Sequence, residues 1–406
     1  MTRSDPKNHQ HRWILIMLSG AMLVSVTLGI RQVFGLFLIP VSTHLETGVH
    51  VFSLAIALQN LVWGASSPIF GAIADKYGPW RVAAFGVLVF ASGLFVMATL
   101  LNEAGIFLGQ ILVGIGIGSA GISIAVGAVA RAAPPEKRSL AMGLVTSFGS
   151  FGQFALVPVT QIFMSDYGWQ FALVMLSAIS ASMVAVSLGL RTPANATRHL
   201  EGPALSTGAA LREATSSRDY ILLTIGFFVC GLQLVFITTH LPTYIRDAGL
   251  SEEIAGWSLS LIGLFNIVGA FVCGWLGGII SKKKTLATVY LLRGITIVIF
   301  ISLPPSPTMA LFFGAAMGLL WLGTIPLTSG LIVTFFGARH LSMLYGLVFF
   351  SHQIGSFVGA WLGGIWYDHF GNYEAMWWLN AGAGLFAFTV NWLIREPRQN
   401  IRPAAA

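Results

Sequence analysis

The sequence predicts an all-α membrane protein with twelve transmembrane helices arranged as two pseudo-symmetric six-helix bundles. Three observations predict this fold class. Only 9% of the 406 residues are charged, and the mean hydropathy is +0.79; in ordinary soluble domains about a quarter of residues are charged. The chain also contains twelve apolar stretches of about 20 residues or more, the length that crosses a bilayer. Its basic residues cluster in every second connection between them.

The first apolar stretch, 13–41, is 29 residues long. A cleavable signal peptide has an apolar core of only about 7–15 residues, so this stretch is predicted to remain as the first span. The other expected spans are 51–74, 82–101, 104–129, 139–164, 168–190, 220–244, 254–280, 285–303, 308–335, 341–366 and 374–394. The polar interruption 191–219 is predicted to be a cytoplasmic linker between an N-terminal bundle, 1–190, and a C-terminal bundle, 220–406.

The basic residues predict the topology, because Lys and Arg favour cytoplasmic loops. With the N-terminus inside, 19 of the 22 Lys and Arg fall on the cytoplasmic side. Arg246 falls on the other face, and Arg31 and Arg293 lie within spans. We therefore expect a multi-pass plasma-membrane protein, placed in the inner membrane if the protein is prokaryotic, with both termini cytoplasmic. The net charge of +7 reflects this topology, and no nucleic-acid partner is expected.

A weak internal repeat favours two parallel halves. The segment 162–169, Ile-Phe-Met-Ser-Asp-Tyr-Gly-Trp, recurs loosely as 365–372, Ile-Trp-Tyr-Asp-His-Phe-Gly-Asn. Gly168 and Gly371 are 203 residues apart, half the chain length. Parallel repeats of this kind bind substrates near the bilayer midplane, between the two bundles.

The connection between spans two and three reads Gly71-Ala-Ile-Ala-Asp75-Lys76-Tyr-Gly78-Pro-Trp-Arg81. It resembles the conserved loop of the major facilitator superfamily, and the resemblance implies a gating loop formed by Gly71, Asp75, Lys76, Gly78 and Arg81. Gly71 would permit close helix packing, and Asp75 would bind a helix end or a cation. An ordinary positive-inside loop would explain the basic residues but not the Gly and Asp spacing. The second copy, 278–284, has no acid, so a latch would depend on the first.

The residues around Arg31, Gly-Ile-Arg-Gln-Val-Phe-Gly-Leu-Phe from position 29, resemble the first span of the monocarboxylate transporter family. The segment 240–249, with Ala255 and Asn266 after it, resembles that family's seventh and eighth spans. The family often has an Asp and an Arg where this chain has Asn266 and Ala270. The cation that binds a carboxylate must therefore come from elsewhere, or the substrate differs.

Candidate site residues are the polar groups inside spans, because they are costly there. The 15 Asp and Glu lie in loops or at helix ends, so proton coupling through a buried carboxylate is not expected. Arg31 is predicted to face an anion; the alternatives are a later start of the first span or a structural bond to backbone carbonyls. Arg293 would contact substrate or have a structural or gating role.

His352 lies near the middle of the eleventh span. It could carry a co-transported proton, since His changes charge near neutral pH, or it could be a packing residue. Gln32, Asn266 and Gln353 could bind carboxylate oxygens or tie helices together. The same two roles, binding carboxylate oxygens or tying helices together, are open to Gln59, Asn60 and Gln233. Mid-span glycines at 314, 318, 355, 359 and 363 are expected to form close-packing surfaces.

These residues predict a secondary active transporter of a small organic anion, most simply a monocarboxylate, that works by alternating access. Proton symport through His352 is one option. The alternatives are an efflux carrier for drug-like or hydrophobic compounds, an organic anion exchanger, and a non-transporting receptor. No span contains a His, Cys and carboxylate cluster, so no enzyme activity, catalytic residue, metal site or cofactor is expected. The expected partners are the anion, a proton and the lipid bilayer.

Overall fold

The computed structural model of the chain describes residues 6–134, 137–191, 207–337 and 341–396. These residues form helices, and none of them lies in a strand. The first half contains α1 (Pro6–Gln32), α2 (Phe34–His44), α3 (Val49–Tyr77), α4 (Pro79–Thr99), α5 (Glu103–Ala120), α6 (Ile122–Ala132), α7 (Arg138–Tyr167), α8 (Trp169–Ser187) and the 3-10 turn η1 (Leu188–Leu190). The second half contains α9 (Thr207–Ser216), α10 (Arg218–Asp247), α11 (Glu252–Ile279), α12 (Lys282–Ser302), α13 (Pro307–Leu319), α14 (Thr324–Phe336), α15 (Leu341–Phe370) and α16 (Glu374–Trp392).

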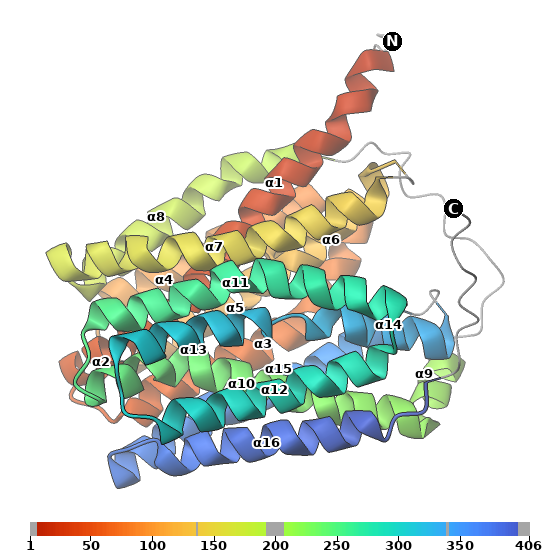
Figure 1. Ribbon diagram of the computed structural model, residues 1–406. Helices are drawn as coiled ribbons and strands as arrows, with labels where there is room; N and C mark the ends of the chain where they lie inside the picture. Colours follow the sequence, from red (N-terminus) through yellow and green to blue (C-terminus); the bar gives the residue numbers. More distant parts are fainter. Residues whose placement is uncertain (1–5, 135–136, 192–206, 338–340, 397–406) are drawn as a thin grey trace.

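The helices reproduce the predicted spans, and the predicted fold class is confirmed. In the described part of the chain, eleven helical segments are long and apolar enough to cross a membrane. The remaining predicted span is α16, which lies alongside α12 (Figure 1). Spans one, four and ten are each divided into two helices, with interruptions at Val33, Gly121 and 320–323. Most of the predicted linker, 192–206, lies outside the described residues.

All the long helices run between two ends of one bundle (Figure 1). We call the end where α1 begins and α16 ends the basic end, because Lys76, Arg81 and Lys282 lie there. The turns after α7 and α15 lie at the opposite end (Figure 1). Gly168 and Gly371 occupy these turns with φ of 85° and 67°, a region that glycine adopts easily. The repeat therefore places equivalent glycines at equivalent turns.

Close packing explains the mid-span glycines, as predicted. A Cβ on Gly355 would lie 2.0 Å from the carbonyl oxygen of Phe228 on α10, and one on Gly359 would lie 2.3 Å from that of Leu232. A Cβ on Gly314 would lie 2.4 Å from the Ser258 oxygen of α11. Glycine at these positions lets α15 pack on α10 and α13 pack on α11 at backbone contact distance.

The two halves meet chiefly through α3 against α15 and α7 against α11. Their close contacts lie at the helix midpoints and from there toward the opposite end. A Cβ on Gly64 would be 2.9 Å from Gln353, and one on Gly263 would be 2.6 Å from the backbone of Phe154. Nearer the basic end of the same four helices, a Cβ on each of four glycines would meet no described atom within 4 Å: Gly71, Gly143, Gly278 and Gly346. The halves are therefore closed together at the opposite end.

Candidate functional site

Arg31 lies in the last turn of α1, two residues before the interruption at Val33. Beyond that interruption α2 continues to His44, 13 residues after Arg31. At the helical rise this separates Arg31 from the opposite end by about 20 Å, too far for the side chain to reach the membrane surface by snorkelling. Arg31 therefore lies deep within the bundle.

Two residues of α3 hold the Arg31 guanidinium. Its Nη2 donates to Oδ1 of Asn60 at 3.0 Å, and its Cζ lies 5.1 Å from the centre of the Trp63 ring, within cation–π range. The buried Nε has no hydrogen-bond partner, and no described carboxylate lies within salt-bridge distance of the side chain. The guanidinium thus carries a positive charge that its surroundings leave uncompensated.

Arg31 borders a small pocket between the two halves. The first half contributes Arg31, Phe34, Gly35, Ile56, Gln59 and Asn60, and α10 of the second half contributes Val235, Thr238 and Thr239. The free space inside the pocket is about that of one water molecule. In this conformation the pocket is therefore nearly closed, and an organic ligand would need the two halves to move apart.

A chain of hydrogen bonds links Arg31 to α15 across the interface between the halves. Gln353 Nε2 donates to the backbone oxygen of Asn60 at 3.2 Å, and its Oε1 lies 2.9 Å from Nδ1 of His352. Because a carbonyl oxygen only accepts, Nδ1 carries the proton. The buried His352 ring also packs against Phe227 and Phe349, with centroid distances of 5.0 and 5.8 Å. Three of the predicted site residues are thus connected.

Gln32 and Asn266 lie away from this chain and tie helices together. Gln32 Nε2 donates to the Leu259 oxygen at 3.4 Å, and Gln32 Oε1 accepts from Gln153 at 3.3 Å. Asn266 Nδ2 donates to Ser150 Oγ at 2.8 Å, and its Oδ1 accepts from the Leu322 amide at 2.9 Å. Neither residue borders the Arg31 pocket.

Arg293 is completely buried on α12 and faces the interruption between α13 and α14. Its Nε donates to the Leu320 oxygen at 2.9 Å, its Nη2 donates to the Trp321 oxygen, and its Nη1 contacts Cys230 Sγ at 3.3 Å. Backbone groups freed by a broken membrane helix need such partners. Arg293 and Asn266 together satisfy three of them, and Arg293 does not border the Arg31 pocket.

The predicted gating loop makes its contacts within the first half. Asp75 pairs with Arg131 at the end of α6, and Arg81 Cζ lies 5.3 Å from the Trp80 ring. Lys76 Nζ lies 5.1 Å from the Tyr77 ring. Gly78 has φ of 92° in the turn between α3 and α4. Gly71 contributes no close helix packing in this conformation, because a Cβ there would meet no described atom within 4 Å.

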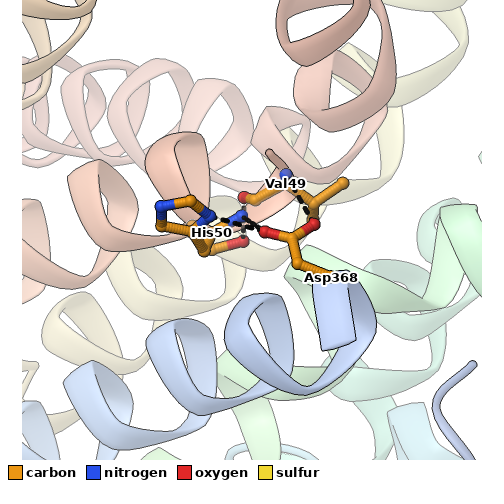
Figure 2. Close-up of polar contacts among 4 residues, drawn as sticks. Val49, His50 and Asp368 are labelled. Carbon is orange, nitrogen blue, oxygen red and sulfur yellow. Dashed lines mark hydrogen bonds and ion pairs between the residues drawn. The ribbon is translucent and has the colours of Figure 1, made fainter. Parts of the chain in front are cut away.

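An unpredicted contact closes the opposite end (Figure 2). Asp368 on α15 accepts hydrogen bonds from the backbone amides of Val49, at 2.9 Å, and His50, at 2.8 Å, and lies 2.6 Å from Nδ1 of His50. The carboxylate thereby caps the N-terminus of α3 from the other half. One sequence signal exists, since the N-cap residue Gly48 has no side chain to cap this helix.

The chain is similar to known transporters. The family model described as Major Facilitator Superfamily matches residues 17–277 and 223–406. Monocarboxylate transporter 13 of Rattus norvegicus is 28% identical over 95% of this chain and 89% of its own length. Monocarboxylate transporter 11 of Homo sapiens is 23% identical, covering 89% and 79%.

A bacterial relative has a different name. The putative niacin/nicotinamide transporter NiaP of Bacillus subtilis is 26% identical over 71% of this chain and 68% of its own length. These matches confirm the resemblance to monocarboxylate transporters that the Arg31 region predicts. Together with the helical bundle, the family match shows that the chain belongs to the major facilitator superfamily.

Proposed function

We propose that this transporter carries a small organic anion, most simply a monocarboxylate, by alternating access, and that Arg31 binds the carboxylate. The observation that carries the proposal is the Arg31 guanidinium at the interface pocket, with no described acid within salt-bridge distance. A charge inside a membrane protein is costly unless it is paired. A bound carboxylate would supply the missing charge, and the names of the mammalian relatives support the same substrate class.

His352 is proposed as the proton carrier. Its ring Nδ1 donates to Gln353, which in turn bonds Asn60, the residue that binds Arg31. Protonation at Nε2 would add a positive charge to a ring that is connected to Arg31 by hydrogen bonds through Gln353 and Asn60. Entry of a proton with the anion keeps the transport cycle electrically neutral. Electroneutrality thus favours symport over transport of the anion alone, and anion exchange, which is equally neutral, stays the alternative.

The basic end is proposed to face the cytoplasm, in the plasma membrane or a bacterial inner membrane, because Lys and Arg favour cytoplasmic loops. The contact of Asp368 with α3 then closes the external side, and the described conformation opens inward. In the other conformation, the loop around Asp75 would close the cytoplasmic side. The bundles 1–190 and 220–406 would move as units around the site.

The substrate class is tested by uptake of radiolabelled lactate, pyruvate and nicotinate into proteoliposomes. Arg31→Gln removes the charge, so saturable uptake should fall at least tenfold while the protein still purifies as a folded monodisperse species. Arg246→Gln is the matched control, since Arg246 pairs with Asp247 in the same helix, outside the pocket. Uptake of no organic anion would refute the substrate class. Normal uptake by Arg31→Gln would assign Arg31 a structural role. An efflux carrier for hydrophobic compounds would then be the better-supported function.

Proton coupling is tested with an inward proton gradient. The gradient should stimulate uptake by the unaltered protein, and His352→Ala should abolish the stimulation while anion counterflow continues. His369→Ala is the control, because this exposed histidine lies on the same helix near the opposite end. A His352 variant with an unchanged response to the gradient would refute the assignment. Counterflow without any gradient response in the unaltered protein would indicate exchange.

A further inference from the structure

The side chain of Gln59 is an unexplained feature of the Arg31 pocket. It is completely buried on α3 and borders the pocket, yet neither its Nε2 nor its Oε1 has a hydrogen-bond partner. A buried amide without partners costs free energy, and such groups are rare in folded proteins. A free donor and a free acceptor at a pocket wall therefore point to a ligand that supplies both partners.

Other polar groups of the pocket are already used within the protein. Asn60 accepts from Arg31 at 3.0 Å and donates to the Ile56 oxygen at 2.8 Å. Thr238 Oγ1 bonds the Leu234 oxygen at 3.1 Å. The buried pocket atoms without a partner belong to Arg31, through Nε, and to Gln59, through both amide atoms. Besides the Thr239 hydroxyl, for which the structure describes no hydrogen bond, the pocket thus offers one cationic donor and one neutral donor–acceptor pair.

The two free groups border the same pocket. Gln59 lies on α3, the helix whose Asn60 binds the Arg31 guanidinium. A ligand whose carboxylate meets Arg31 would therefore bring its neighbouring atoms toward Gln59. Because an amide both donates and accepts, it can pair with a hydroxyl or with a carbonyl group.

We propose that Gln59 is a specificity-determining residue, which binds a neutral polar group close to the substrate carboxylate. The substrates are then small hydroxy- or oxo-carboxylates, and unsubstituted acids of the same size are disfavoured. This assignment rests on the proposed function of Arg31. The physical basis is that a site with a buried hydrogen-bonding group rejects an analogue that leaves the group unpaired.

The test compares lactate, pyruvate and propionate, which have the same number of carbon atoms, by initial uptake rate in proteoliposomes. The unaltered protein should prefer lactate and pyruvate to propionate by about tenfold or more, since a site that pairs a substrate hydroxyl discriminates strongly. Gln59→Leu should reduce this preference to within about threefold while it preserves or raises propionate uptake, because no polar group remains unpaired.

Gln110→Leu is the matched control. Gln110 is also completely buried with both amide atoms unpartnered, but it lies on α5 and does not border the pocket. This variant should keep the preference of the unaltered protein. Gln59→Met, which is unbranched and of similar volume, gives the same test if Gln59→Leu does not fold.

The outcomes separate the two proposals. Equal uptake of propionate and lactate by the unaltered protein would overturn the role of Gln59, as would an unchanged preference in both Gln59 variants. In either case, loss of all carboxylate uptake in Arg31→Gln would still uphold the anion site. Carboxylate uptake that survives Arg31→Gln would overturn the proposed function itself, together with the specificity that rests on it.

Discussion

Arg31, which is partly buried, and Arg293, which is completely buried, both lie inside spans, yet their surroundings differ. Neither has a described carboxylate within salt-bridge distance. Arg293 uses its three nitrogens on two backbone carbonyls and a thiol, and it borders no described pocket. Arg31 makes one side-chain hydrogen bond, has an unpartnered Nε, and borders a pocket between the halves. The difference teaches that unused donors, more than burial of a charge, distinguish the candidate ligand site.

The helix interruptions explain why Arg293, but not Arg31, donates hydrogen bonds to backbone carbonyls. At Val33 the chain stays near helical geometry, with φ of −87° and ψ of −6°, and local bonds join Val33 to Ile30 and Leu36 to Val33. The interruption at 320–323 is longer, and there the Leu320 carbonyl and the Leu322 amide bond to side chains of other helices. These groups need side-chain partners in a membrane. Arg293 is one such partner, whereas Arg31 is not needed by its own interruption.

The largest expected effect comes from Arg293→Gln. Two buried carbonyls would lose their donors, at about 1–3 kcal/mol each, so the variant should lose about 2–6 kcal/mol of stability. Arg293→Lys should recover only part of it, because an ammonium lacks the planar fork of a guanidinium. Thermal unfolding in detergent, followed by size-exclusion chromatography, measures the effect. Arg31→Gln is the control and should unfold like the unaltered protein. An Arg293→Gln protein that stays fully stable but loses uptake would make Arg293 a substrate contact.

A smaller effect is expected for two asparagines, one beside each arginine. Asn266→Ala removes the acceptor of the Leu322 amide and should lower stability by about 1–3 kcal/mol. Asn60→Ala removes the acceptor of Arg31 Nη2 and should mainly reduce anion uptake, because the guanidinium loses its fixed position. Unfolding temperature and initial uptake rate, measured on both variants, separate the two roles. The contrast fails if Asn60→Ala is the less stable variant, or if Asn266→Ala reduces uptake alone.

Much of the fold could be predicted from the sequence, because bilayer thickness and loop charge leave few alternatives. The twelve spans follow from long apolar stretches, and the packing of Gly355 and Gly314 follows from glycines in mid-span positions. The divided spans were not predicted. The residues Trp321 to Gly323 are as apolar as their neighbours, so hydropathy alone does not reveal that the helix is interrupted there.

The candidate site could be predicted only in part, for the same reason. The cost of intramembrane polarity singled out Arg31, His352 and Gln353, which the structure connects through Asn60. It singled out Arg293 and Asn266 equally, because composition does not tell whether a polar side chain meets a ligand or a freed backbone group. Asp368 was classed with the acids at helix ends. Its contact with α3 joins residues more than 300 positions apart, which no local pattern reveals.

The smallest expected effect is that of removing the Asp368 contact. It tests whether this contact at the opposite end controls access to the Arg31 pocket but not to the region around Arg293. Asp368→Asn keeps the shape of the side chain but removes the charge that caps α3, an interaction of about 1 kcal/mol. The closed conformation should lose about fivefold in population relative to the open one. Thr239→Cys reports this, since Thr239 is buried and borders the pocket, and a membrane-impermeant maleimide added on the side of the opposite end should label it about fivefold faster.

Asp247→Asn is the matched control for this labelling. Asp247 pairs with Arg246 within α10 and makes no described ion pair across the halves, so its substitution should leave the labelling rate unchanged. The native cysteines are buried, and the maleimide labelling rate of the protein without the Thr239→Cys substitution gives the background. Equal labelling in Asp368→Asn and its parent would mean that glycine packing along α3 and α11 alone closes this end. Faster labelling with an unchanged unfolding temperature would instead show that the Asp368 contact controls access to the Arg31 pocket without stabilising the fold. The Arg293 contacts, by contrast, are expected to stabilise the fold.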